Sequence, residues 1–217
     1  MTITELSREF DVLYENISSN QAPGLDEYEK SVFLTTAQEE VLFNVYNGEG
    51  FESKEESRRY LSSLIKTARL KPFIKEKGKE DTYSTISNKS KVFKLPKDIL
   101  FITYEAATTM NSTVPDNLEV IPTTQDEYHR VKKNPFRNNS KKRALRLDLE
   151  DNLVEIVSPY NLSGYTVRYV RKPSPIILYN DNTDLKIDGD SKHSLEELHP
   201  LLYRIILKRA VALAIAK

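Results

Sequence analysis

The residues with the clearest chemical character are basic, and they lie between Tyr128 and Leu147 in a stretch without any acid. Such side chains can neutralise nucleic-acid phosphates, with binding that weakens as salt rises, or they can dock on an acidic neighbouring chain. They can also be solvated or paired within the molecule. Only Tyr128 and Phe136 interleave with them, fewer aromatics than a stacking platform for single strands needs. The candidate subunit-interface or DNA-contact residues are Arg130, Lys132, Lys133, Arg137, Lys141, Lys142, Arg143 and Arg146.

Residues able to carry catalysis or hold a metal are scarce. The chain has no cysteine, so it has no thiol nucleophile and no thiolate ligand. It also lacks the GxSxG, GxxxxGK[ST] and GxGxxG motifs. His193 and His199 do not share the helical face that zinc ligands use, and His129 lies alone in the basic stretch. We therefore expect no catalytic, metal-binding or cofactor-binding residue, and a protein that is not an enzyme.

A group of aspartates between residues 181 and 190 resembles a calcium-binding loop at first sight. Lys186, however, occupies a position where the loop needs an oxygen ligand, and the closing glutamate is missing. The sequence therefore predicts no cation there.

The net charge of zero conceals an uneven distribution. Residues 1–56 carry 13 acids and 3 bases, a net charge of −10, whereas residues 57–146 carry 20 bases and 9 acids, a net charge of +11. Complementary patches can fix a register between copies that meet head to tail. The same charges can instead pair within one molecule or remain solvated.

The chain of 217 residues is long enough to bury a substantial core. No apolar run approaches the roughly 18 residues that a membrane helix needs, and the first ten residues do not resemble a signal peptide. We expect a cytoplasmic protein that makes no contact with a membrane.

In the first third and at the end of the chain, apolar residues recur at helical spacing and capping signals mark the expected helix starts. Thr2 with Glu5, and Ser53 with Glu56, have the spacing of a capping box, and Pro200 suits the first turn of a helix. The expected helices cover residues 3–18, 25–46 and 54–70, with a closing apolar helix after Pro200.

The middle of the chain changes to the period of two that is typical of strands. Asp151-Asn152 suits a tight hairpin turn, and Thr124 is expected to cap a brief helix over 125–132. The longest strand begins at Leu162 and should lose its ladder at Pro173 and Pro175, which have no backbone donor. The other expected strands begin near Lys91, Ile99, Leu118, Leu145 and Val154.

Together these elements predict an α+β fold. A helical bundle of the N-terminal helices and the C-terminal helix would carry an inserted, mainly antiparallel β lobe. The expected divisions are an N-terminal helical lobe over 1–79, the β lobe over 80–180, and a loop with the returning C-terminal helix over 181–217.

Several stretches resemble a known family. The opening FDVLYENISSNQAPGLDEYEKSVFLTTAQEEVLFNVYNG is similar to virion proteins of crAss-like and related tailed phages. The KLPxD segment at Lys94, the NPFR loop at Asn134, YTVRYVRKPSPIIL from Tyr165 and LEELHPLL from Leu195 resemble the head-to-tail adaptor, or tail tubular protein A, family. These are packing and turn motifs, and they extend over nearly the whole chain.

The resemblance implies a structural part of a phage neck. Such proteins form a ring, commonly dodecameric, between the portal and another neck or tail protein, and genomic DNA passes through the lumen. The expected location is the virion, after assembly in the cytoplasm of the host bacterium. The alternative function that the residues leave open is a DNA-binding or packaging accessory protein that uses the basic 128–147 segment.

Overall fold

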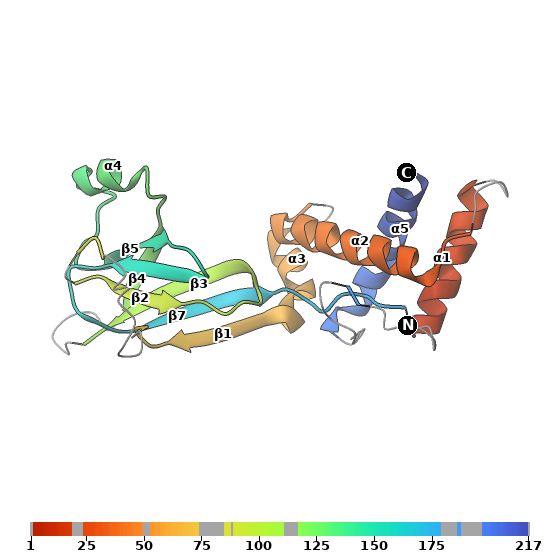
Figure 1. Ribbon diagram of the computed structural model, residues 1–217. Coiled ribbons are helices and arrows are strands. Elements are labelled where there is room, and N and C mark those ends of the chain that lie inside the picture. Colours follow the sequence, from red (N-terminus) through yellow and green to blue (C-terminus); the bar gives the residue numbers. More distant parts are fainter. Residues whose placement is uncertain are drawn as a thin grey trace. The chain divides into compact units, whose positions relative to one another are not determined.

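The computed structural model describes residues 2–18, 24–49, 53–73, 85–87, 89–110, 117–178, 186–187 and 197–216. The chain has a mixed α+β fold, as predicted, and forms two compact units (Figure 1). One unit combines Met1–Leu64 with Lys172–Lys217, and its described residues form four α-helices. The other unit, Ile65–Arg171, contains the sheet.

The first two helices begin at capping boxes. In α1 (Ile3–Ser18), the amide of Glu5 donates to the Thr2 hydroxyl at 3.2 Å and the Thr2 amide donates to the Glu5 carboxylate at 2.7 Å. In α2 (Glu27–Asn47), Asp26 and Glu29 make the same exchange, and Gly48 ends the helix at φ 81°. A side-chain partner at each helix start satisfies amides that the helix itself leaves unbonded.

The third expected helix was predicted too long. Helix α3 covers only Lys54–Tyr60 and begins at the predicted cap Ser53, and a short 3₁₀ turn, η1 (Ser62–Leu64), follows it. The remainder of the expected helix is strand β1 (Ile65–Leu70), which pairs along its whole length with β7 (Leu162–Arg171). Pairing with a distant strand therefore outweighs the local helical pattern.

The closing helix α5 (Pro200–Ile215) contacts α2 and α1. Its first turn has Pro200 at N1, as predicted, and the cap is His199, whose ring nitrogen accepts from the Leu201 amide. Ser194 with Glu197 also has the spacing of a capping box in the sequence, but Ser194 lies outside the described residues.

Residues 172–178 form an extended segment on α2, and we call it the strap. The ladder of β7 ends at Arg171, in agreement with the prediction for the two prolines. The Ile176 amide instead donates to the Thr35 hydroxyl at 3.2 Å, and the Leu178 amide donates to the Ser31 hydroxyl at 2.9 Å. Side chains of α2 therefore replace the missing strand partner.

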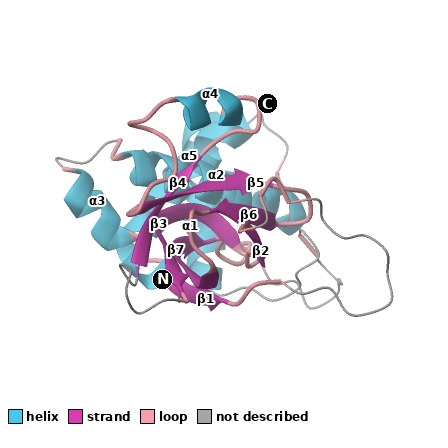
Figure 2. Ribbon diagram, turned by 90° about the vertical axis from the view of Figure 1, so that its left-hand side faces the viewer, coloured by secondary structure: helices cyan, strands magenta, loops and turns pink. Residues whose placement is uncertain are grey.

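The second unit is a seven-stranded sheet in the order β1-β7-β3-β4-β5-β6-β2. The prediction of a mainly antiparallel sheet is confirmed, since among the described strands only β4 and β5 are parallel neighbours. The sheet curls (Figure 2), and the Phe73 amide, just after β1, donates to the Val92 carbonyl of β2 at 2.7 Å. The strands not yet bounded are β2 (Lys91–Lys94), β3 (Ile99–Thr109), β4 (Asn117–Pro122), β5 (Arg143–Asp148) and β6 (Leu153–Val157).

Apolar side chains fill one face of the curled sheet and cover part of the other. The larger cluster lies on one face and centres on Phe93 and Tyr165, whose rings are 5.4 Å apart. The smaller cluster joins α4 (Tyr128–Lys133) to Leu145, Leu147 and Val157. The alternation of inward and outward residues along each strand supplies both layers.

Two local predictions within the sheet unit have different outcomes. The hairpin turn at Asp151-Asn152 is confirmed, because both residues have left-handed backbones, at φ 56° and 58°, as a type I′ turn requires. The prediction that Thr124 caps a helix over 125–132 is wrong. Helix α4 follows Glu127, whose side chain makes no capping hydrogen bond.

Candidate functional site

The basic run lies on the connection between the parallel strands β4 and β5. Parallel neighbours need a crossover, and here the crossover consists of α4 and the loop 134–142. Tyr128 and Val131 anchor α4 on the smaller apolar cluster. The helix is therefore fixed to the sheet by its apolar side, and its basic side chains are exposed.

Six of the eight predicted residues are exposed on this crossover, which we call the basic crossover. Arg130 pairs with Glu127, and the Lys132 ammonium lies 5.7 Å from the centre of the Tyr128 ring. The other four make no ion pair with any residue that the structure describes. The exposed set is Arg130, Lys132, Lys133, Arg137, Lys141 and Lys142.

Arg143 has a mainly structural position at the start of β5. It is half-buried, and its guanidinium donates to the Phe136 carbonyl at 2.7 Å, which ties the loop back to the strand. Its Nε also lies 3.9 Å from the Glu119 carboxylate.

Arg146 is separated from the basic crossover, because it lies on the side of the sheet that holds the larger core. Its guanidinium pairs with the buried Glu105 and lies 3.0 Å from the Asp148 carboxylate. Burial raises the pKa of Glu105 despite Arg146, and burial with the neighbouring Glu105 raises the pKa of Tyr165. This arrangement is a buried ion pair in the core, and it leaves Arg146 little surface to offer a partner.

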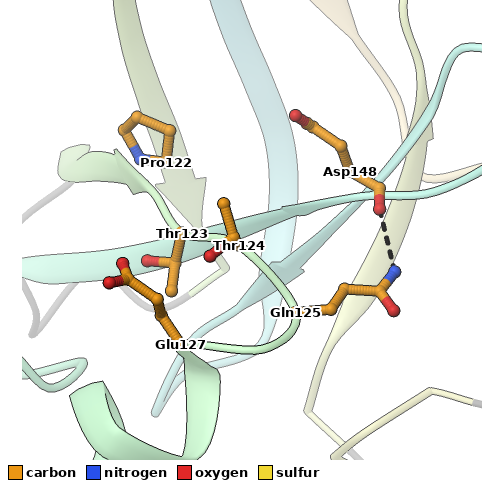
Figure 3. A pocket seen from close by; sticks show the side chains of 6 residues that line it. All are labelled: Pro122, Thr123, Thr124, Gln125, Glu127 and Asp148. Carbon is orange, nitrogen blue, oxygen red and sulfur yellow. Dashed lines mark hydrogen bonds between the residues drawn. The ribbon is translucent and has the colours of Figure 1, made fainter.

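A hollow of about 370 Å³ lies between the start of the crossover and the end of β5 (Figure 3). The Gln125 amide donates across it to the Asp148 carbonyl at 3.0 Å. Both carboxylates that line it, Glu127 and Asp148, are paired with arginines. The described lining contains two threonine hydroxyls, and none of its residues is a histidine, lysine or cysteine that could activate them as nucleophiles.

About half of the 13 acids of residues 1–56 have a described partner within the helical unit. Glu5, Asp26 and Glu29 take part in caps. The ion pairs Asp11–Lys30, Glu39–Lys172 and Glu40–Arg209 engage three further acids. Much of the acidic excess that the sequence shows therefore has an intramolecular role.

The histidines within the described residues have ordinary surroundings. His129 is exposed beside Tyr128, and His199 caps α5 with its ring 4.9 Å from that of Tyr60. His193 and the aspartates of the calcium-like loop lie outside the described residues. Across the described ranges, no three His, Asp or Glu side chains are grouped as metal ligands would be. None of the helices described here combines the length and apolar character needed to cross a membrane.

Comparison with known proteins gives matches along the whole chain. The family described as "Phage tail ring protein 3/4" matches residues 1–217. "Ring protein 3" of Bacteroides phage crAss001 is 43% identical over 225 residues, covering 99% of this chain and 95% of that protein. "Ring protein 4/5" of the same phage is 36% identical over 231 residues, covering 99% of this chain and 92% of that protein. This chain therefore belongs to the phage tail ring protein 3/4 family, whose members are structural ring proteins of crAss-like phages.

Proposed function

We propose that this protein is one subunit of an oligomeric ring in the neck of a tailed-phage virion. The ring joins the portal to the next neck or tail protein and forms part of the channel for genomic DNA. The observation that carries this proposal is the family match over the entire chain, with two ring proteins of one phage as relatives. The expected place of assembly is the cytoplasm of the host bacterium.

The architecture of the site supports a structural role. The basic crossover presents charge on a short, well-anchored element, and the described hollow beside it contains no activated nucleophile. Copies that meet through two different surfaces form a closed ring when the rotation between them closes. A dodecamer is the number of copies that the resemblance to neck adaptors favours.

A direct test is the mass of the purified protein, measured by native mass spectrometry alone and then with its portal. A mass corresponding to a closed ring in either condition supports the proposal. A monomer in both conditions contradicts it.

The second candidate function is DNA binding by the basic crossover, for which the six exposed bases are the supporting observation. Affinity for duplex DNA should then fall steeply with salt, with a log–log slope of about −0.9 for each neutralised phosphate.

A ring that lets DNA slide should avoid strongly positive walls. We therefore propose that the crossover faces a neighbouring chain or the ring exterior, and a shallow salt slope is the expected result.

A further inference from the structure

Helix α5 has apolar residues on all sides, although the described residues of its own unit cover only one side. The inner side is buried and includes Leu202, Ile206 and Ala210. The outer side leaves large aliphatic side chains in solvent, at 53% for Leu201, 44% for Ile205 and 39% for Ile215. A helix that is apolar all round is normally enclosed within a larger protein or assembly.

The outer side of α5 forms one continuous surface with basic character. Leu201, Ile205, Ala212 and Ile215 follow helical spacing. Arg204 and Lys208 are exposed next to them and make no ion pair with another described residue. Helix α5 contains no acid. We call this surface the α5 outer face, and its chemistry is aliphatic and positive.

Helix α2 has an outer face of the opposite sign. Tyr28, Val32 and Phe43 recur at helical spacing and are exposed, from 37% for Val32 to 53% for Phe43. Glu29 and Glu39 lie among them on the same side of the helix. The only base in α2, Lys30, is buried and pairs with Asp11 at 2.6 Å.

Glu39 keeps open surface on this α2 outer face. Glu39 pairs with Lys172 at 2.9 Å, yet its side chain is still 47% exposed. The chemistry of the α2 outer face is therefore aromatic and negative, and it is complementary to that of the α5 outer face.

We propose that the α2 outer face of one subunit docks on the α5 outer face of the next subunit. Within a unit, α2 and α5 contact each other through their buried sides, so their outer faces point in different directions. Each subunit can then bind one neighbour by α2 and another by α5. This is the head-to-tail arrangement that closes into a ring, and it rests on the proposed function.

A hollow beside the α5 outer face provides room for a docking side chain. It measures about 500 Å³ and lies between α1 and α5. Leu201 and Arg204 belong to both the hollow and the α5 outer face, with Glu5, Glu9 and Pro200 lining the remainder. An aromatic ring from α2 fits the apolar wall, and a ring placed there can also stack on the Arg204 guanidinium.

Disulfide trapping tests this contact, and it can be used even if the ring is unstable in solution. The natural chain has no cysteine, so only the introduced thiols can form the bond. We would prepare Val32→Cys and Ile205→Cys, one of them with a mass tag, and mix the two under mild oxidation. The expected product is the mixed disulfide dimer, formed on the order of tenfold or more faster than either self-dimer because docking raises the effective concentration of the thiols. The double variant should form a ladder of higher oligomers.

Matched controls use Val12→Cys on α1, which is exposed at 57% and lies outside both outer faces. Pairing it with either partner should give only the slow background rate. Faster self-dimers of Ile205→Cys or of Val32→Cys would indicate a two-fold symmetric contact and overturn the proposal. A mixed dimer that forms no faster than this background would also overturn the proposal.

A second measurement separates this inference from the proposed function. Ile205→Glu and Val32→Glu, each shown by circular dichroism to remain folded, should each lose the ring mass. A mixture should recover a 1:1 dimer and no larger species, because each copy retains one intact face. If both variants still form rings, the ring function stands and the assigned contact is wrong. If the wild type forms no ring, the proposed function itself fails.

Discussion

The buried pair Glu105–Arg146 is the residue-level feature with the largest expected effect on stability. Both side chains are mostly covered, at 7% and 12% exposure, and the Tyr165 hydroxyl lies in the same core. Removal of one member leaves an uncompensated buried charge, whereas replacement of both by apolar residues removes the need for compensation.

Arg146→Met should therefore lower the free energy of unfolding by about 3 kcal/mol at neutral pH. The double variant Glu105→Leu/Arg146→Met should recover most of that loss. Urea denaturation followed by circular dichroism measures both. Equal losses in the single and double variants would mean that the ion pair is not the source of the effect.

The pH dependence of the same site follows from the raised pKa of Glu105. Because burial keeps a proton on the folded carboxyl above its ordinary pKa of 4.5, the folded state binds more protons than the unfolded state in that window. The free energy of unfolding then falls as pH rises from 4.5 towards the raised pKa. Denaturation across this range should show the fall in the wild type relative to Glu105→Gln. Parallel pH curves for the two proteins would contradict the assignment.

Among the structural elements, the strap is unusual because its backbone amides depend on side chains of α2 for hydrogen-bond acceptors. The Thr35 and Ser31 hydroxyls accept from the amides of Ile176 and Leu178 in a buried setting. A buried amide that loses its only acceptor costs about 1 to 3 kcal/mol.

Thr35→Val should therefore destabilise the protein by about 1 to 3 kcal/mol and speed hydrogen exchange at the Ile176 amide. Thr36→Val is the matched control, since the Thr36 hydroxyl is exposed and bonds only within α2, to Val32. Similar losses for the two variants would show that the strap bond contributes little.

The β5–β6 hairpin offers a second test at this scale. Asn152 holds a left-handed backbone at φ 58°, which glycine adopts without steric cost and a β-branched residue does not. Asn152→Gly should change the stability by less than about 1 kcal/mol, because relief of the left-handed backbone is opposed by the greater freedom that glycine gives the unfolded chain. Asn152→Val should lower the melting temperature. A melting temperature for Asn152→Val equal to that of the wild type would argue against the turn.

For the whole molecule, the relevant feature is the basic crossover, because it is an exposed surface that another chain can contact. Arg137, Lys141 and Lys142 are exposed and make no ion pair with a described residue. The triple change of these residues to Glu should weaken assembly while the subunit stays folded, as native mass and circular dichroism would show. The physical reason is that a neighbouring chain bound to the basic crossover would then face negative instead of positive charge.

The control for this experiment must change net charge by the same amount. Arg69→Glu/Lys71→Glu/Lys97→Glu does so at exposed positions of the same unit that lie outside the run. Assembly that weakens equally in both triple variants would reflect general charge repulsion, and unchanged assembly would remove the crossover from the interface.

Much of the fold was predictable from short stretches of sequence. Thr2 and Ser53 mark the starts of α1 and α3, Pro200 opens α5, and Asp151 begins the tight turn. These features depend on partners within a few residues, so local chemistry is enough to specify them. The family resemblance was predictable for a related reason, since its motifs are local turn and packing motifs.

The candidate site was predictable only in part. The sequence identified all eight bases, but it could not separate the exposed members from Arg146. The alternation along β5 places Arg146 on the side of Ala144, yet only the curled sheet makes that side the core and brings Glu105 of β3 to it. Which face of a strand is buried depends on what covers it.

By itself, the sequence determined where most helices and strands begin, where the positive charge gathers and which family the chain resembles, because each of these depends on neighbouring residues. Only the tertiary structure decided that Ile65–Leu70 is a strand, that Arg146 is a core residue and that α2 and α5 retain outer apolar faces. Each of those outcomes is set by contacts between residues far apart in the chain, and such contacts override local preference when they bury surface or complete a ladder.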